Sequence, residues 1–211
     1  NYLVRLGWSH GDQEIFSKNE LTNLFSLEKI HQSPANFDQK KLFWVNQQWL
    51  KNISLDDIAP LLTPFLINIG MEPNNKDLVL SIAEVMKDRS STLEEISNKS
   101  EFIFSRPSFY DQDAQKKFFG EDILEIFSNI ENSLLALKDW SNESIQEAVK
   151  LVADNMDHKL ISIAQPIRIA MTGSIISPGI GETLFLLGKK ETIVRIKNIN
   201  MYIREKNNSY E

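Results

Sequence analysis

The sequence contains no cysteine, only three histidines, and no apolar run that approaches 18 residues. Without cysteine, the chain cannot form disulfide bonds, attack with a thiol or bind zinc through thiolates. A membrane-spanning helix needs about 18 or more apolar residues in succession. We therefore expect a cytoplasmic protein that has no membrane partner.

Familiar catalytic motifs are also missing. The sequence has no Gly-x-Ser-x-Gly elbow, no His-Glu-x-x-His, no phosphate-binding glycine loop and no Gly-x-Gly-x-x-Gly. One loop, WSHGDQE at residues 8–14, does group polar side chains. Ser9, His10 and Asp12 leave an autonomous hydrolase open, and His10, Asp12 and Glu14 leave a metal site open. Because triad members usually converge from different parts of a chain, we predict a turn histidine here, with no catalytic residue and no metal ligand.

The net charge is −6, whereas a nucleic-acid-binding face is expected to be basic. The charge is unevenly distributed, however. Residues 1–60 hold six basic and seven acidic residues, residues 61–150 hold nine and sixteen, and residues 151–211 hold eight and six. A basic surface is therefore expected only toward the C-terminal third, and we expect no DNA partner.

Apolar residues recur at helical spacing along most of the chain, which predicts an all-α fold of helical bundles. Ser17 followed by Glu20 is typical of a capping box, and Asp38 and Ser54 are typical N-caps. Pro60 and Pro64 lie close enough to the start of a helix to bend it. The expected helices cover residues 38–52, 54–70, 76–87, 92–99, 111–120, 121–140 and 142–156, followed by two more on either side of the loop near residues 173–179.

The stretch QPIRIAMTGSIISPGIGETLFLLG, residues 165–188, is the most distinctive part of the chain. Two apolar helical segments are split by a loop rich in glycine and hydroxyl side chains, with Arg168 on its N-terminal flank. Thr172-Gly173 and Pro178-Gly179 are also the ordinary stop and start signals of a helix hairpin, in which Arg168 would be a surface residue bridging to Glu182. Both interpretations fit the residues alone.

Two separated segments settle the choice through a resemblance. NYLVRLGWSHGDQEIFS (residues 1–17), followed by SPANFDQKKLFWVN (33–46), resembles the stem-contact region of bacterial glutamyl-tRNA synthetases. QPIRIAMTGSIISPGIGETLFLLGKKETIVRI (165–196) resembles the anticodon-binding helical domain of the same family. The resemblance covers essentially the whole chain and corresponds to the C-terminal half of the family. The family's His-Ile-Gly-His-type motif and Lys-Met-Ser-Lys-Ser loop, which belong to its catalytic domain, do not occur here.

The resemblance implies a site that reads the tRNA anticodon. By position in the family, Arg168, Ser177, Pro178 and Ile180 would lie against the first and second anticodon bases, and Arg89 would contact the third. Arginine suits this task because its planar guanidinium stacks on bases and donates to base oxygens or phosphates. Pro178 is expected in the first turn of the following helix, where its missing N–H costs no hydrogen bond.

The resemblance also implies an organisation and a function. We expect a stem-contact part at residues 1–53 and anticodon-binding subdomains at 54–101 and 102–211. The chain would bind tRNA for glutamate as a monomer and would be inactive alone, while the parent ligase would use ATP and Mg²⁺, with no cofactor in this segment. The acidic middle and the helix-rich content leave a helical protein-interaction module as the alternative.

Overall fold

The structure is a computed structural model that describes residues 1–31, 36–72 and 74–208. Pro34, which the sequence marks as a turn, lies outside the described residues. Within these ranges the chain is helical with two isolated β-bridges, which confirms the predicted all-α class. The α-helices are α1 (Lys18–Leu24), α2 (Gln39–Asn52), α3 (Leu55–Asn68), α4 (Lys76–Met86), α5 (Leu93–Phe104), α6 (Gln112–Phe118), α7 (Ile123–Ala136), α8 (Asn142–Asn155), α9 (Leu160–Thr172), α10 (Ile180–Leu187) and α11 (Lys189–Asn208).

Short 3-10 turns accompany these helices: η1 (Val4–Leu6), η2 (Leu27–Lys29) and η3 (Lys87–Arg89). The predicted N-caps are confirmed, because the side chains of Ser17, Asp38 and Ser54 each accept hydrogen bonds from backbone N–H groups in the first turn of the helix that follows. One helix, α3, continues through Pro60 and Pro64. No helix in the described ranges is both long and apolar enough to cross a membrane.

Two helices end more than two residues away from the predicted position. Helix α5 extends to Phe104 rather than residue 99, since Ile96 and Ser100 continue its buried face. Helix α7 ends at Ala136 instead of near residue 140. There the Lys189 ammonium donates to the carbonyl oxygens of Leu135 and Leu137, both at 2.8 Å, and supplies hydrogen bonds that a further helical turn would otherwise provide.

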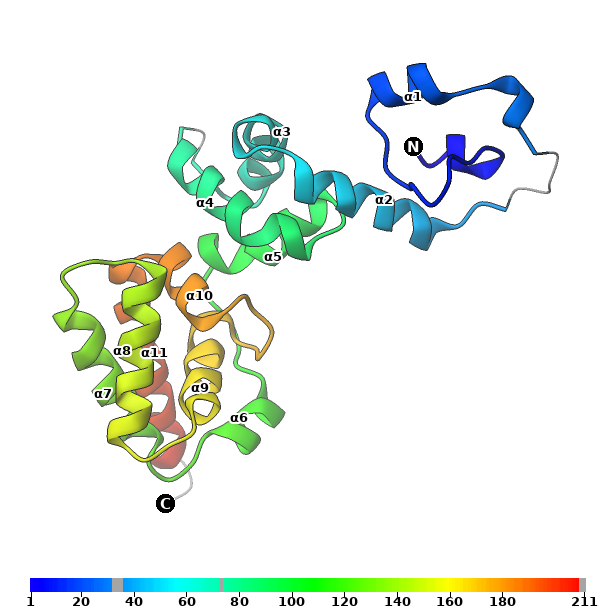
Figure 1. The fold of residues 1–211 in the computed structure, drawn as a ribbon. Helices are drawn as coiled ribbons and strands as arrows, with labels where there is room; N and C mark the ends of the chain where they lie inside the picture. The colour runs from blue at the N-terminus through cyan, green and yellow to red at the C-terminus, as the bar shows by residue number, and fades with distance from the viewer. Residues whose placement is uncertain (32–35, 73, 209–211) are drawn as a thin grey trace.

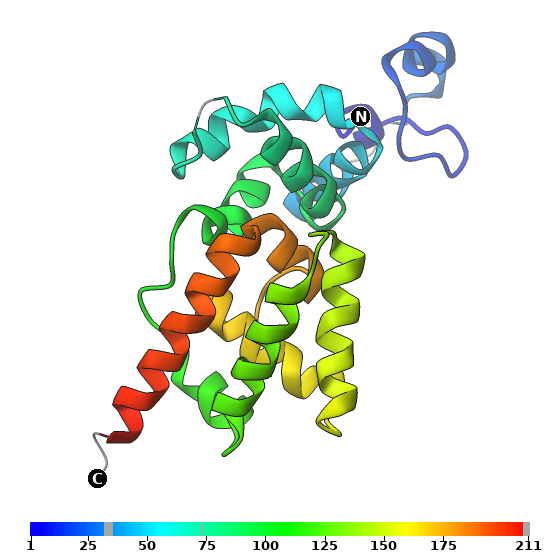
Figure 2. The ribbon, with the colours of Figure 1, turned by 90° about the vertical axis from the view of Figure 1, so that its left-hand side faces the viewer.

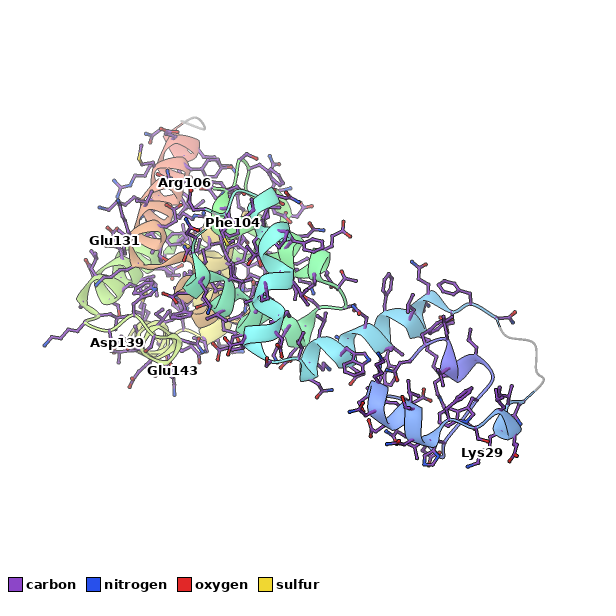
Figure 3. The ribbon with its side chains drawn as sticks, turned by 90° about the horizontal axis from the view of Figure 1, so that it is seen from above. Lys29, Phe104, Arg106, Glu131, Asp139 and Glu143 are labelled. Atoms are coloured by element: carbon purple, nitrogen blue, oxygen red, sulfur yellow. The ribbon has the colours of Figure 1, made fainter. Side chains whose placement is uncertain are left out.

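The helices gather into two bundles and an N-terminal extension (Figures 1 and 2). Helices α3, α4 and α5 enclose one apolar core, and α7 to α11 enclose a larger one. Seen from above, the segment that holds Lys29 lies at the opposite end of the molecule from Glu131, Asp139 and Glu143 of the larger bundle (Figure 3). Helix α2 connects this segment to the smaller bundle.

Helix α10 contributes to both cores. Leu184 and Leu187 are buried in the larger core, whereas Leu186 is buried in the smaller one. The aromatic ring of Phe185 packs against both. The two bundles are thus joined through apolar side chains of α10 as well as through the chain itself.

Candidate RNA interface

A cavity of about 650 Å³ lies where the two bundles meet. Its walls come from η3, from the C-terminal half of α5 and the segment after it, and from α9 and the α9–α10 loop. This volume lies within the range of ordinary ligand sites. The lining residues are Met86, Arg89, Asn98, Lys99, Glu101, Phe102, Ser105, Arg106, Pro107, Ser108, Phe109, Arg168, Thr172, Ile176, Ser177, Pro178 and Gly179.

The cavity is basic although the chain is acidic. Four cationic side chains and one carboxylate line it, in a protein of net charge −6. Three of the cations pair with carboxylates: Lys99 with Glu95 at 2.7 Å, Arg106 with Glu191 at 2.8 Å, and Arg89 with Glu182. The fourth, Arg168, forms no salt bridge with any described residue. Arg168 is therefore the cavity cation that no described carboxylate contacts directly, although Glu101 also lines the cavity.

Arg168 is also poorly satisfied as a hydrogen-bond donor. Among the described residues its guanidinium forms a single, long hydrogen bond, from Nη2 to the carbonyl oxygen of Pro178 at 3.4 Å. Its Nε is buried and has no partner in the part of the chain that the structure describes. Buried donors in native proteins are nearly always paired, so this guanidinium has the capacity to bind an anionic or carbonyl-bearing ligand. The alternative placement of Arg168 against Glu182 is wrong, because Glu182 pairs with Arg89.

The loop between α9 and α10 is held by its own hydrogen bonds. Gly173 ends α9 in the left-handed region at φ 78°. Thr172 Oγ1 donates within the turn and accepts from the N–H of Ser174 at 3.3 Å. Ser177 Oγ donates to the carbonyl oxygen of Pro178 at 3.0 Å and accepts from Thr183 Oγ1 at 3.0 Å. These bonds fix the loop against the start of α10.

Pro178 lies outside α10 rather than in its first turn. The N-cap is Gly179 and the helix begins at Ile180. The reason is the carboxylate of Glu182, which accepts the Gly179 N–H at 2.7 Å and sets the start of the helix one residue after the proline. Pro178 still lines the cavity, but Ile180 is 8% exposed and belongs to the larger core. The structure therefore brings Arg89, Arg168, Ser177 and Pro178 to one cavity, whereas Ile180 is buried in the larger core.

Arg89 reaches the cavity from η3 and forms a two-point ion pair with Glu182. Nη1 lies 2.6 Å from Oε2 and Nη2 lies 2.8 Å from Oε1. Burial opposes the charge of Glu182, but the hydrogen bonds from Arg89 and Gly179 hold the pKa of this carboxyl below its usual value. The same pair raises the pKa of Arg89. Because 47% of the Arg89 side chain is exposed, its outer face is open to the cavity.

Sequence reasoning missed a second arginine network that supports the cavity wall. Arg195 on α11 is 2% exposed, and it donates to Glu191 Oε1 at 2.8 Å and to the carbonyl oxygens of Met171 and Ser105. Glu191 also binds Arg106 through two hydrogen bonds of 2.8 Å. Arg106 first, and then Arg195, hold the pKa of Glu191 at about 2 despite partial burial. The spacing of Glu191 and Arg195, four residues apart on one helix, is the signal that could have indicated this pair.

In the N-terminal loop, His10 and Glu14, two of the residues that the sequence left open as site candidates, contact other side chains. The ring of His10 stacks on Trp8 with centroids 6.1 Å apart. Glu14 binds Arg5 at 2.8 Å and Lys41 at 3.2 Å. No group of three or more His, Cys, Asp or Glu suited to a metal ion occurs among the described residues. Salt bridges to Arg5 and Lys41 therefore account for the carboxylate of Glu14.

Comparisons with known proteins identify the domain that contains this cavity. The family model described as "Anticodon binding domain" matches residues 57–200, which include the whole cavity wall. A glutamate–tRNA ligase 1 of Syntrophus aciditrophicus is 42% identical over 204 residues, and a glutamate–tRNA ligase 2 of Halorhodospira halophila is 38% identical over 205; each match covers 97% of this chain.

Solved structures give the same result. A glutamate tRNA ligase of Elizabethkingia meningosepticum superposes with a TM-score of 0.86 at 29% identity, over 93% of this chain and 39% of that one. The chain spans only 43% of the length of the two ligases above. The resemblance to glutamyl-tRNA synthetases is thereby confirmed, and the chain belongs to the anticodon-binding-domain family.

Proposed function

We propose that this chain binds the anticodon loop of tRNA for glutamate in the cavity between its two bundles. The observation that carries the proposal is Arg168, which lines this cavity, forms no salt bridge with a described residue and has a buried Nε without a hydrogen-bond partner among those residues. Single-stranded RNA loops are read by side chains that stack on bases and bond to their edges. Arginine does both, and it also binds phosphate. Membership of the family supports this function over a protein-interaction module.

Specific roles follow from position. Arg168, Ser177 and Pro178 contact the first and second anticodon bases, and Arg89 contacts the third. Glutamate and glutamine tRNAs differ at that third base, so an arginine there favours tRNA for glutamate. Ile180, at 8% exposure, acts by supporting the loop from the core side. The preformed hydrogen bonds of residues 172–183 support this assignment, because a rigid loop loses little entropy on binding.

The parent protein, on this proposal, is a monomeric cytoplasmic ligase that attaches glutamate to tRNA with ATP and Mg²⁺. We assign the use of ATP and Mg²⁺ to the catalytic part of the parent protein and no cofactor to this segment. We divide the chain into a stem-contact part at residues 1–53 and anticodon-binding parts at 54–101 and 102–211. On this division the 211 residues alone bind tRNA and have no ligase activity.

The test is a binding titration of the 211-residue chain with tRNA for glutamate, unmodified and with its third anticodon base changed, at two salt concentrations. We expect the unmodified tRNA to bind more tightly. We also expect binding to weaken as salt rises, because each phosphate contact releases counterions. Equal binding of both tRNAs would contradict the anticodon role, and binding that is insensitive to salt would contradict the role of the cations.

A further inference from the structure

We propose that Phe109 is a stacking platform for one base of the RNA loop that the cavity holds. No resemblance or family match assigns a role to this residue. The inference rests on the proposed function, because it takes single-stranded RNA as the ligand. It is carried by the position, exposure and backbone support of Phe109.

Phe109 is a large apolar side chain that the protein leaves in water. Its exposure is 74%, and it lines the cavity beside Arg106 and Pro107. Across the cavity wall, Ile176 of the α9–α10 loop also lines the space and is 84% exposed. Single exposed apolar residues are common on protein surfaces. Two of them at the edge of one basic cavity indicate a ligand with a flat apolar face.

The backbone that follows Phe109 is held in place by hydrogen bonds. The N–H of Asp111 donates to the carbonyl oxygen of Gly173 at 2.8 Å, and Gln115 Nε2 donates to the carbonyl oxygen of Tyr110 at 2.9 Å. The ring of Tyr110 packs on Tyr202 of α11 with centroids 5.0 Å apart. The Phe109 carbonyl itself lies close against Gly173, where a methyl group would approach within 2.5 Å. An exposed ring on a fixed backbone binds at low entropic cost.

The charge of the surroundings favours a nucleobase over an apolar peptide segment. Arg89, Lys99, Arg106 and Arg168 line the same cavity, with Glu101 as the one acidic lining residue. Three of these cations already pair with carboxylates, and an apolar peptide segment offers no anion to the fourth, Arg168, which forms no salt bridge with a described residue. A nucleotide has both parts, a flat base for the phenyl ring and a phosphate for the guanidinium groups. Stacking of a base on an aromatic side chain is worth about 1–3 kcal/mol, which corresponds to roughly 5- to 150-fold in affinity.

The experiment uses a hairpin RNA that carries only the anticodon stem and loop of tRNA for glutamate, with 2-aminopurine placed at each loop position in turn. Stacking quenches the fluorescence of this base. For the native chain we expect quenching at one or more positions. For Phe109→Ala we expect loss of quenching at one position and weaker binding by roughly 5- to 150-fold. Phe109→Tyr should retain both signals, whereas Phe109→Leu, which keeps apolar area without a ring, should lose the quenching.

Phe37→Ala is the matched control, because Phe37 is 69% exposed and lies outside the cavity. If the native chain does not bind the hairpin, the proposed function itself fails. If the native chain binds, Arg168→Ala weakens binding and Phe109→Ala does not, the proposed function stands and the stacking role of Phe109 is overturned. Quenching that survives in Phe109→Ala at every position would overturn it equally.

Discussion

Arg89 and Glu182 are 93 residues apart in the sequence and meet through two hydrogen bonds of 2.6 and 2.8 Å. This ion pair connects η3 in the smaller bundle to α10 in the larger one. Glu182 has a second task, since it accepts the N–H of Gly179 and sets the start of α10. One carboxylate therefore orients a cavity arginine and ends the α9–α10 loop.

A double-mutant cycle measures the coupling between these two residues. We expect Arg89→Met and Glu182→Gln to show an interaction free energy of about 1 kcal/mol in urea unfolding, because the arginine is half exposed and water screens the pair. Glutamine can still accept the Gly179 N–H, so Glu182→Ala should destabilise the chain by about a further 1 kcal/mol through loss of the cap. Additive effects of the first two substitutions would show that the ion pair contributes nothing to stability.

Replacement of Arg168 tests the binding cavity directly. We expect Arg168→Ala to weaken binding of tRNA for glutamate by about 1–3 kcal/mol and to reduce discrimination at one anticodon base. Arg204→Ala is the control, because it removes the same charge from an exposed position of α11 outside the cavity wall. The two variants should therefore differ in titrations with native and base-changed tRNA, and similar affinities and preferences for both would argue against a reading role for Arg168.

The paired charges of Glu191 predict a specific pH dependence of stability. Its pKa is about 2 in the folded chain against an ordinary value of 4.5. Because the folded pKa is the lower one, the stabilisation is complete above about pH 4.5 and is lost as the pH falls toward 2.

Glu191→Gln should therefore destabilise the chain by about 3 kcal/mol near neutral pH, since it leaves the buried Arg195 unpaired, and the difference from native should shrink toward pH 2. Urea unfolding at several pH values measures this. Glu131→Gln is the control: Glu131 pairs with Lys197 at 3.6 Å, and the Lys197 side chain is 62% exposed. Loss of this exposed ion pair should lower the free energy of unfolding by less than about 1 kcal/mol. A difference that stays constant with pH would contradict the assignment of Glu191.

Gly173 is predicted to tolerate no side chain. Its φ is 78°, and a methyl group would meet the Phe109 carbonyl oxygen at 2.5 Å and Pro107 Cβ at 3.1 Å. Gly11 has a φ of 53° and nothing within 4 Å of the same position, so Gly11→Ala reports the conformational cost alone. We expect Gly11→Ala to lower the free energy of unfolding by about 1–2 kcal/mol. Gly173→Ala should lower it clearly further, as measured by thermal unfolding. Equal losses would mean that the close approach to Phe109 is relieved without cost.

Local features were predictable from the sequence. The caps at Ser17, Asp38 and Ser54 were predicted and are confirmed, because a cap depends on residues within one turn of each other. The apolar spacing likewise predicted the helices, with the largest errors at the ends of α5 and α7. At α7 the end depends on Lys189, which lies more than 50 residues away and is invisible to a local pattern.

The candidate site was predictable only in part. Resemblance to a family indicated Arg89, Arg168, Ser177, Pro178 and Ile180; the structure brings the first four to one cavity, whereas Ile180 is buried in the larger core. Nothing in the spacing indicated that Glu182 would pair with Arg89 rather than Arg168, because the choice depends on how two bundles meet. The buried Arg195 and the exposed Phe109 were also missed, although the spacing of Glu191 and Arg195 on one helix was a local signal for the first. The division of the chain at residues 53 and 101 stays a prediction.

Helix α10 buries Leu186 in the smaller core and Leu184 and Leu187 in the larger one. Neither core can melt without exposing part of the other. The two bundles should consequently unfold in one cooperative thermal transition, and a chain cut between them would expose Leu186 and become prone to aggregation. We therefore expect this short helix to couple the two bundles into a single cooperative folding unit.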